Sequence, residues 1–160
     1  MKGHRKSDDG YEQFRSDTNV CDGVSCRRKG VRAMFKRVDH VEIVTRNAEK
    51  TIDFYVNVLG FRIRSRKEMK VPPMREIIYI ELGDTVIEII SVDDPKPKSE
   101  NPWEIGYRGI ALEVDDMAMA VDYLKGKGIA IAREPIDLGN SFRGEIRDPD
   151  GLLIELRQWK

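Results

Sequence analysis

The chain has 160 residues, of which 40% are hydrophobic and 35% charged, so it can bury the core of one ordinary domain beneath a well-solvated surface. Its 28 basic and 28 acidic residues balance, which removes the electrostatic reason to expect a nucleic-acid partner. No apolar run approaches the ~20 residues needed to span a bilayer, and the N-terminus lacks the apolar segment of a signal peptide. We therefore expect a soluble, cytoplasmic protein without membrane association.

Residues 1–33 differ in composition from the rest of the chain. They hold eight Lys or Arg and five Asp or Glu, few aliphatic residues, and no helix or strand period. Such a segment buries too little apolar surface to offset its ordering entropy, so it is predicted to be a flexible arm. Its cysteines, Cys21 and Cys26, have no second ligand pair for zinc and are interpreted as reduced thiols.

The remaining residues, 34–160, are predicted to form two modules with the same order of elements. In module 34–92 a strand-like run precedes a helix that starts after Asn47 and stops at Gly60, and three more strand-like runs follow, at 61–66, 76–82 and 85–91. The segment 93–107 contains three prolines and is interpreted as a linker. In module 108–160 a strand and a helix precede strand-like runs at 129–133, 142–147 and 152–157.

A sequence shift of 69 residues places Ile52-Asp53-Phe54 on Val121-Asp122-Tyr123 and places His40 on Gly109. A shift of 67 places residues 86–89 on residues 153–156. The pattern predicts an α+β fold of two β-α-β-β-β modules, each with a curved sheet backed by a helix.

Two glutamates are the most informative residues. Glu88 and Glu155 interrupt the apolar strands VIEII and LLIEL at equivalent positions, and strand alternation sends both of them, with His40, to the face away from the aliphatic side chains. A buried carboxylate is costly unless a cation or a hydrogen bond satisfies it. We therefore predict a metal site formed by His40, Glu88 and Glu155. Two alternatives stay open: the glutamates pair with arginines such as Arg143 or Arg62, and His40 is a histidine with a purely structural role.

Four stretches of the chain resemble the vicinal oxygen chelate superfamily, which includes glyoxalase I, methylmalonyl-CoA epimerase, extradiol dioxygenases and bleomycin-resistance proteins. They are DHVEIVTRNAEKTIDFYVNVLGF, GDTVIEII, RGIALEVDDMAMAVDYLKGKGI and RDPDGLLIEL. The resemblance implies a glyoxalase-like fold with a cup-shaped sheet, a homodimer, and a divalent ion (Ni, Zn, Co, Mn or Fe). His40, Glu88 and Glu155 match three ligand positions of the family, whereas Gly109 occupies the fourth, which is usually histidine.

The resemblance also implies a function. We expect a metal-dependent lyase or isomerase that transfers a proton on a small substrate with adjacent oxygens, with Glu155 or Glu88 as the base. Arg143 is a candidate for binding an anionic part of that substrate. Gly109 favours the alternative, a non-catalytic small-molecule-binding protein of the bleomycin-resistance type. Further glutamates, Glu42, Glu76 and Glu113, are interpreted as solvated or structural.

Overall fold

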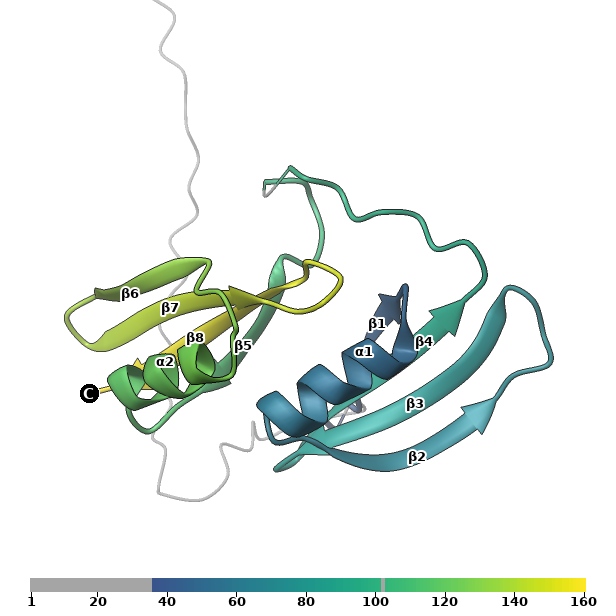
Figure 1. Cartoon of the computed structure of the whole chain (residues 1–160), viewed down its shortest axis with the longest axis horizontal. Coiled ribbons are helices and arrows are strands. Elements are labelled where there is room, and N and C mark those ends of the chain that lie inside the picture. The colour runs from purple at the N-terminus through teal and green to yellow at the C-terminus, as the bar shows by residue number, and fades with distance from the viewer. Residues whose placement is uncertain (1–35, 102) are drawn as a thin grey trace, which may run out of the picture. The chain divides into compact units, whose positions relative to one another are not determined.

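The computed structural model describes residues 36–101 and 103–160. The predicted arm at 1–33, with Cys21 and Cys26, lies outside the described residues. Two four-stranded sheets, each with a helix, account for the regular structure of the described part (Figure 1). Among these residues, neither helical segment is both long and apolar enough to cross a membrane.

The first module begins with β1 (Val41–Thr45) and continues into α1 (Ala48–Asp53), whose N-terminus is capped by the Asn47 side chain accepting from the Lys50 N–H at 3.1 Å. The helix extends as a π-helical turn, η1 (Phe54–Val58). Its remaining strands are β2 (Arg62–Glu68), β3 (Met74–Leu82) and β4 (Thr85–Val92). The sheet order is β1-β4-β3-β2, with β1 parallel to β4 and the other pairs antiparallel.

The second module repeats this arrangement. It comprises β5 (Gly109–Glu113), α2 (Met117–Gly126), β6 (Arg133–Asp137), β7 (Ser141–Arg147) and β8 (Leu153–Trp159), in the sheet order β5-β8-β7-β6. Here the Asp116 side chain caps the helix by accepting from the Met119 N–H at 2.9 Å. The predicted α+β fold of two β-α-β-β-β units is confirmed.

The strand predicted at 129–133 is wrong. The Ile129 N–H donates to the Leu124 carbonyl, so this residue still belongs to the helix end and is not part of a sheet ladder. Both Ile129 and Ile131 pack against the core as partly buried residues outside any strand. Their apolar alternation therefore reflects core packing, and β6 itself begins only at Arg133.

The core lies on the helix-facing side of both sheets. Strand residues such as Ile78, Ile89 and Ile154 are fully buried there, and they form one cluster with Tyr55 of η1 and Leu124 of α2. Complete burial of one such aliphatic side chain stabilises the fold by about 1.5–3 kcal/mol. Because the cluster draws on both modules, the two share a single core.

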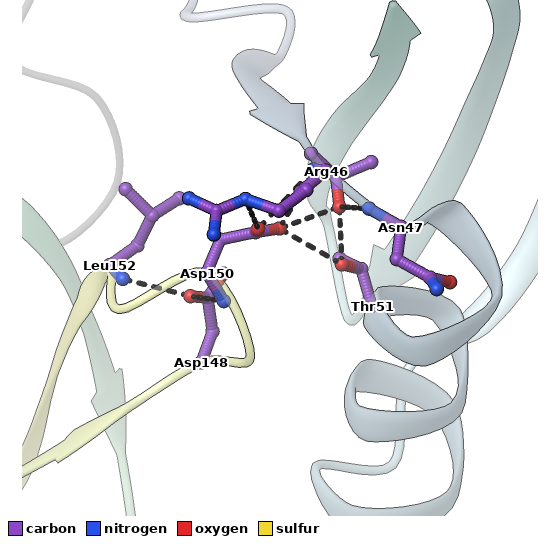
Figure 2. A network of polar contacts seen from close by, with 7 residues as sticks. Arg46, Asn47, Thr51, Asp148, Asp150 and Leu152 are labelled. Atoms are coloured by element: carbon purple, nitrogen blue, oxygen red, sulfur yellow. Dashed lines mark hydrogen bonds and ion pairs between the residues drawn. The ribbon is translucent and has the colours of Figure 1, made fainter. Parts of the chain in front are cut away.

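A polar network also joins the modules, at the turn between β7 and β8 (Figure 2). The carboxylate of Asp150 accepts from the hydroxyl of the buried Thr45 at 2.6 Å and from the Arg46 N–H at 3.2 Å. Asp148 accepts from the Leu152 N–H at 2.8 Å and from the Tyr55 hydroxyl at 3.4 Å. Burial raises the pKa of Asp148 above its ordinary value. The turn of the second module thereby holds the start of the first module's helix.

Candidate metal centre

The strand register relates the two modules position by position. In the first sheet Glu42 of β1 lies opposite Glu88 of β4, and in the second Ala111 of β5 lies opposite Glu155 of β8. His40 stands two residues before Glu42, and Gly109 stands two residues before Ala111. His40 and Gly109 therefore occupy equivalent places in the two modules. The residue equivalent to the first module's histidine is therefore a glycine in the second.

Three side chains of the first module converge on the face of its sheet that points away from α1. The Nε2 atom of His40 lies 3.0 Å from Glu88 Oε2 and 3.4 Å from Glu42 Oε1. One potential ligand atom from each of the three residues lies within 4.8 Å of the other two. Among residues 36–101 and 103–160, no other set of three or more His, Cys, Asp or Glu residues brings its ligand atoms this close together. An imidazole nitrogen with two carboxylates is a donor set that suits a divalent cation.

The surroundings orient His40. Its Nδ1 lies 3.0 Å from Asp39 Oδ2, and an ionised carboxylate can only accept, so this contact requires a proton on Nδ1. In the neutral imidazole, Nε2 then presents its lone pair to two carboxylates, which favours either an added proton or a bound cation. The pKa of His40 is accordingly raised above its usual value, chiefly by the hydrogen bond to Asp39 and then by the one to Glu42.

Glu88 is the buried member of this group. Its side chain is only 8% exposed, and the hydroxyl of Tyr79, on the neighbouring strand β3, donates a hydrogen bond to it. That bond raises the pKa of Tyr79, which keeps the phenol protonated. The Tyr79 ring also meets the His40 ring edge-on, with centroids 5.6 Å apart. The two side chains that contact Glu88 are thus also packed on each other.

Glu155, by contrast, lies in an ion-pair network. Its Oε2 is 2.7 Å from Arg143 Nε, and its Oε1 accepts from Arg157 Nε at 2.9 Å. The Nε–H of Arg143 does not point at the carboxylate, so that contact is an ion pair and not a hydrogen bond. In the described part of one chain, Glu155 is not brought together with His40 and Glu88. The arginine pairing left open from the sequence is found for Glu155, whereas Arg62 pairs with Glu81 at 3.0 Å.

Glu145 is a residue that sequence reasoning missed. It lies directly opposite Glu155 across β7 and β8, is buried, and is contacted by Arg143 at 2.6 Å and by Arg108 and Arg133 at 3.6 and 3.7 Å. Two glutamates facing each other on one sheet repel unless cations separate them. The sequence did contain a signal for this contact, because Glu145 stands two positions after Arg143 in a predicted strand. Alternation along a strand places two such residues on the same face of the sheet.

Gly109 has no room for a side chain. A Cβ atom at this position would lie 2.4 Å from the Leu153 carbonyl oxygen of β8, its partner in the ladder. The obstacle is backbone and not a flexible side chain. The absence of a ligand at this position is therefore built into the packing of β5 on β8.

These two unequal halves can be compared with known proteins. Residues 37–156 match the family model described as the Glyoxalase/Bleomycin resistance protein/Dioxygenase superfamily. The chain belongs to this superfamily. Its curated relatives include a lactoylglutathione lyase of Neisseria meningitidis serogroup A, 34% identical over 133 residues that cover 78% of this chain and 91% of the relative. Human mitochondrial methylmalonyl-CoA epimerase is 30% identical over 139 residues, which cover 76% and 73%.

Solved structures of the superfamily agree with the fold. A glyoxalase family protein from Enterococcus faecalis aligns with a TM-score of 0.67 and 27% identity, covering 77% of this chain and 98% of that protein. The match spans both modules, so the glyoxalase-like architecture predicted from the sequence is confirmed.

This superfamily member has a cavity of about 930 Å³ beside its candidate metal centre. It is lined by residues in and just before β1 and in β5, among them His40, Glu42, Gly109 and Ile110. The volume is sufficient for a small organic molecule. A ligand in this cavity could therefore reach the imidazole and the exposed glutamate together.

Proposed function

We propose that this chain is a metal-dependent, glyoxalase-type lyase or isomerase that acts by proton transfer on a small substrate with adjacent oxygens. The observation that carries the proposal is the convergence of His40 Nε2 with the carboxylates of Glu42 and Glu88. The names of the relatives, a lactoylglutathione lyase and a methylmalonyl-CoA epimerase, support the same class of reaction. The metal is nickel, zinc, cobalt, manganese or iron.

A divalent ion at this site would stabilise the negative charge that develops on substrate oxygens when a neighbouring C–H loses its proton. The chain's own residues supply the rest. His40 would hold the ion through Nε2, while Asp39 orients the ring through its contact with Nδ1. Glu88 is the proposed base, because its buried carboxylate lies beside Nε2 of His40. It would take a proton from a substrate carbon and return it to the substrate, so the reaction involves no net oxidation. The Tyr79 hydroxyl, kept protonated, holds that carboxylate in place.

The second module supplies the proposed substrate contact. Arg143 is 21% exposed and lies between Glu145 and Glu155, so an anionic group of the substrate could bind its guanidinium in competition with these carboxylates. Glu155, which the sequence suggested as a further ligand or base, would first have to leave Arg143 and Arg157. Its role in the reaction stays a prediction.

We also propose that the protein is a homodimer. Among the described residues β1 and β5 each pair with one strand only, which leaves one edge of each sheet open beside the cavity. Val44 on β1 is 51% exposed and Tyr107, just before β5, is fully exposed. A second copy would cover both. Light scattering on the purified chain tests the proposal, and a monomer at micromolar concentration contradicts it.

Metal content and proton exchange test the enzymatic proposal together. The purified chain is expected to hold stoichiometric metal and to exchange substrate C–H protons with D₂O, using hemithioacetals and acyl-CoA thioesters as probes. Replacing Glu88 by Gln should abolish exchange, whereas replacing Glu49, an exposed glutamate of α1, by Gln should not change it. Metal-loaded protein that exchanges no proton on either probe class would refute the enzymatic proposal.

Two observations favour a second candidate, a non-catalytic binding protein. Gly109 removes a ligand position, and the carboxylate of Glu155 is already engaged by arginines. This candidate would be supported if the purified chain holds no metal above background and if variants with Gln at positions 88 and 155 are as stable as the parent. Calorimetric titration with aromatic and amphiphilic small molecules would then identify what it holds.

A further inference from the structure

We propose that a second cavity, at the joint between the two modules, binds a phosphate group. The volume of this cavity is about 350 Å³, and its walls come from the end of β1, from the segment between the modules and from the turn between β7 and β8. Four basic side chains line it: Arg46, Lys98, Arg108 and Arg147. The site is separate from the reaction proposed above, because binding here requires neither a metal ion nor a reacting carbon.

The fold brings these four cations together from distant parts of the sequence. Arg46 directly follows β1, and Arg147 is the last residue of β7. Lys98 lies in the segment between the modules, and Arg108 directly precedes β5. Figure 2 shows the Arg46 side chain extended over the turn of Asp150, whose carboxylate lies 4.0 Å from Arg46 Nε. Both modules and their connecting segment therefore contribute positive charge to one cavity.

Much of this positive charge has no carboxylate partner. Within the part of the chain that the structure describes, the side chains of Lys98 and Arg147 donate only to backbone carbonyls, at 3.4 and 2.9 Å. Arg108 lies 3.6 Å from Glu145, a carboxylate that it shares with two other arginines. A ligand that supplies several acceptor oxygens would satisfy donors that the protein itself leaves without a charged partner.

Two carboxylates also line the cavity, Asp150 and Glu100. Asp150 is only 16% exposed, and its oxygens already accept from the Thr45 hydroxyl at 2.6 Å and from the Arg46 N–H at 3.2 Å. Glu100 is exposed, so water can solvate its charge. Four cations against two acids leave a surplus of two positive charges. A phosphate group, which carries about −1.5 to −2 charges at pH 7, matches that surplus.

The kinds of side chain also suit phosphate. The guanidinium of arginine donates two parallel N–H bonds to a pair of phosphate oxygens, and lysine adds a compact point charge. This cavity shares Arg46, Arg108 and Asp150 with the larger cavity beside the candidate metal centre. The phosphate is therefore either free in solution or carried by a larger ligand that extends out of that cavity. The same side chains would bind it in both cases.

Calorimetric titration of the full chain tests the proposal. Inorganic phosphate and adenosine 5′-monophosphate are added separately at constant ionic strength, and the phosphorus NMR line width follows the same titrations. Three variants are compared with the parent: Arg147→Gln, Arg147→Lys and Lys98→Gln. The matched control is Arg64→Gln, because Arg64 is likewise an exposed arginine on a strand, β2, but lines neither cavity.

We expect Arg147→Gln and Lys98→Gln each to weaken phosphate binding by about tenfold, the effect of losing one charge-assisted hydrogen bond at the lower end of its range. Arg147→Lys keeps the positive charge and should weaken binding less. Arg64→Gln should bind phosphate as the parent does. Lys98 lies outside every helix and strand, so its replacement should leave the protein folded, which thermal melting verifies.

The two ligands separate the two sources of phosphate. Tighter binding of the nucleotide than of inorganic phosphate, weakened by the same variants, identifies a phosphate carried by a larger ligand. Equal or weaker binding of the nucleotide identifies a site for free phosphate. The proposal is overturned if the parent binds neither ligand, or if Arg147→Gln and Lys98→Gln bind phosphate as tightly as the parent. Neither result bears on the metal-dependent function, which proton exchange tests separately.

Discussion

The carbonyl oxygen of Leu153 occupies the place that a side chain at Gly109 would need. The two residues are partners in the parallel ladder of β5 and β8, and a Cβ on Gly109 would lie 2.4 Å from that oxygen. Any larger residue must therefore push the two strands apart. The equivalent residue of the first module, His40, carries an imidazole, so the two modules differ at this position.

Replacing Gly109 by Ala should destabilise the protein. Forcing one extra carbon into a packed site costs about 1–3 kcal/mol, which we expect as the loss in free energy of unfolding measured in urea. Gly126→Ala is the matched control, since nothing lies within 4 Å of a Cβ at the end of α2, and alanine is the better helix former there. Equal stability of both variants would contradict the steric argument. For the same reason Gly109→His should lower stability without raising metal affinity.

Asp150→Ala should weaken the joint between the two modules. The substitution removes the acceptor for the Thr45 hydroxyl and the Arg46 N–H, and hydrogen bonds to a charged group contribute about 1.5–3 kcal/mol. We expect a loss of that size in the free energy of unfolding. Asp84→Ala, in the exposed turn between β3 and β4, is the control and should stay within about 0.5 kcal/mol of the parent. A loss no larger than that of the control would show that the joint contributes little.

The pH dependence of stability should report the burial of Asp148. Its pKa is raised in the folded state, chiefly by desolvation, so folding favours the protonated acid. That contribution is fully present below the unfolded pKa of about 3.9 and is lost as pH rises through the raised folded value. Asp148→Asn does not titrate and can still accept from the Asp150 and Leu152 N–H groups. The parent should therefore lose stability relative to the variant between about pH 3 and pH 7. A pH-independent difference would contradict this.

Arg143→Gln should separate substrate binding from catalysis. Arg143 contacts Glu145 and Glu155 on the second module, away from the His40 group of the first. Because a binding contact that is equal in ground and transition states affects KM alone, we expect KM for an anionic substrate to rise at nearly constant kcat. Steady-state kinetics with an anionic and an uncharged substrate measures this. A fall in kcat with unchanged KM would assign Arg143 a different role.

Local patterns in the sequence were sufficient to predict most of the fold. The alternation in VIEII and LLIEL, and the helix start at Asn47, depend on neighbours within a few residues, so they can be read without tertiary information. The segment 129–133 could not be placed this way, because an apolar alternation looks the same whether it pairs in a sheet or packs on a core.

The candidate site was only partly predictable for the same reason. His40 and Glu88 stand out because they interrupt or precede apolar strands. The exposed Glu42 looked like an ordinary surface residue, and its link to Glu88 depends on the register of a parallel pair that are 46 positions apart in the sequence. The arginines around Glu155 come partly from other strands, and a sequence does not show which of several nearby arginines reaches a given carboxylate.

The segment that connects the modules contributes no helix or strand in its described residues, 93–101 and 103–108, while the modules share one core and the Asp150 joint. Cohesion between the halves therefore does not depend on the covalent connection. A protease that cuts beside the exposed Ile105 should leave two fragments that migrate together until denaturant is added. By the same argument, the two modules expressed as separate polypeptides should assemble into one complex. The connecting segment is also a suitable place to insert a tag or a reporter domain.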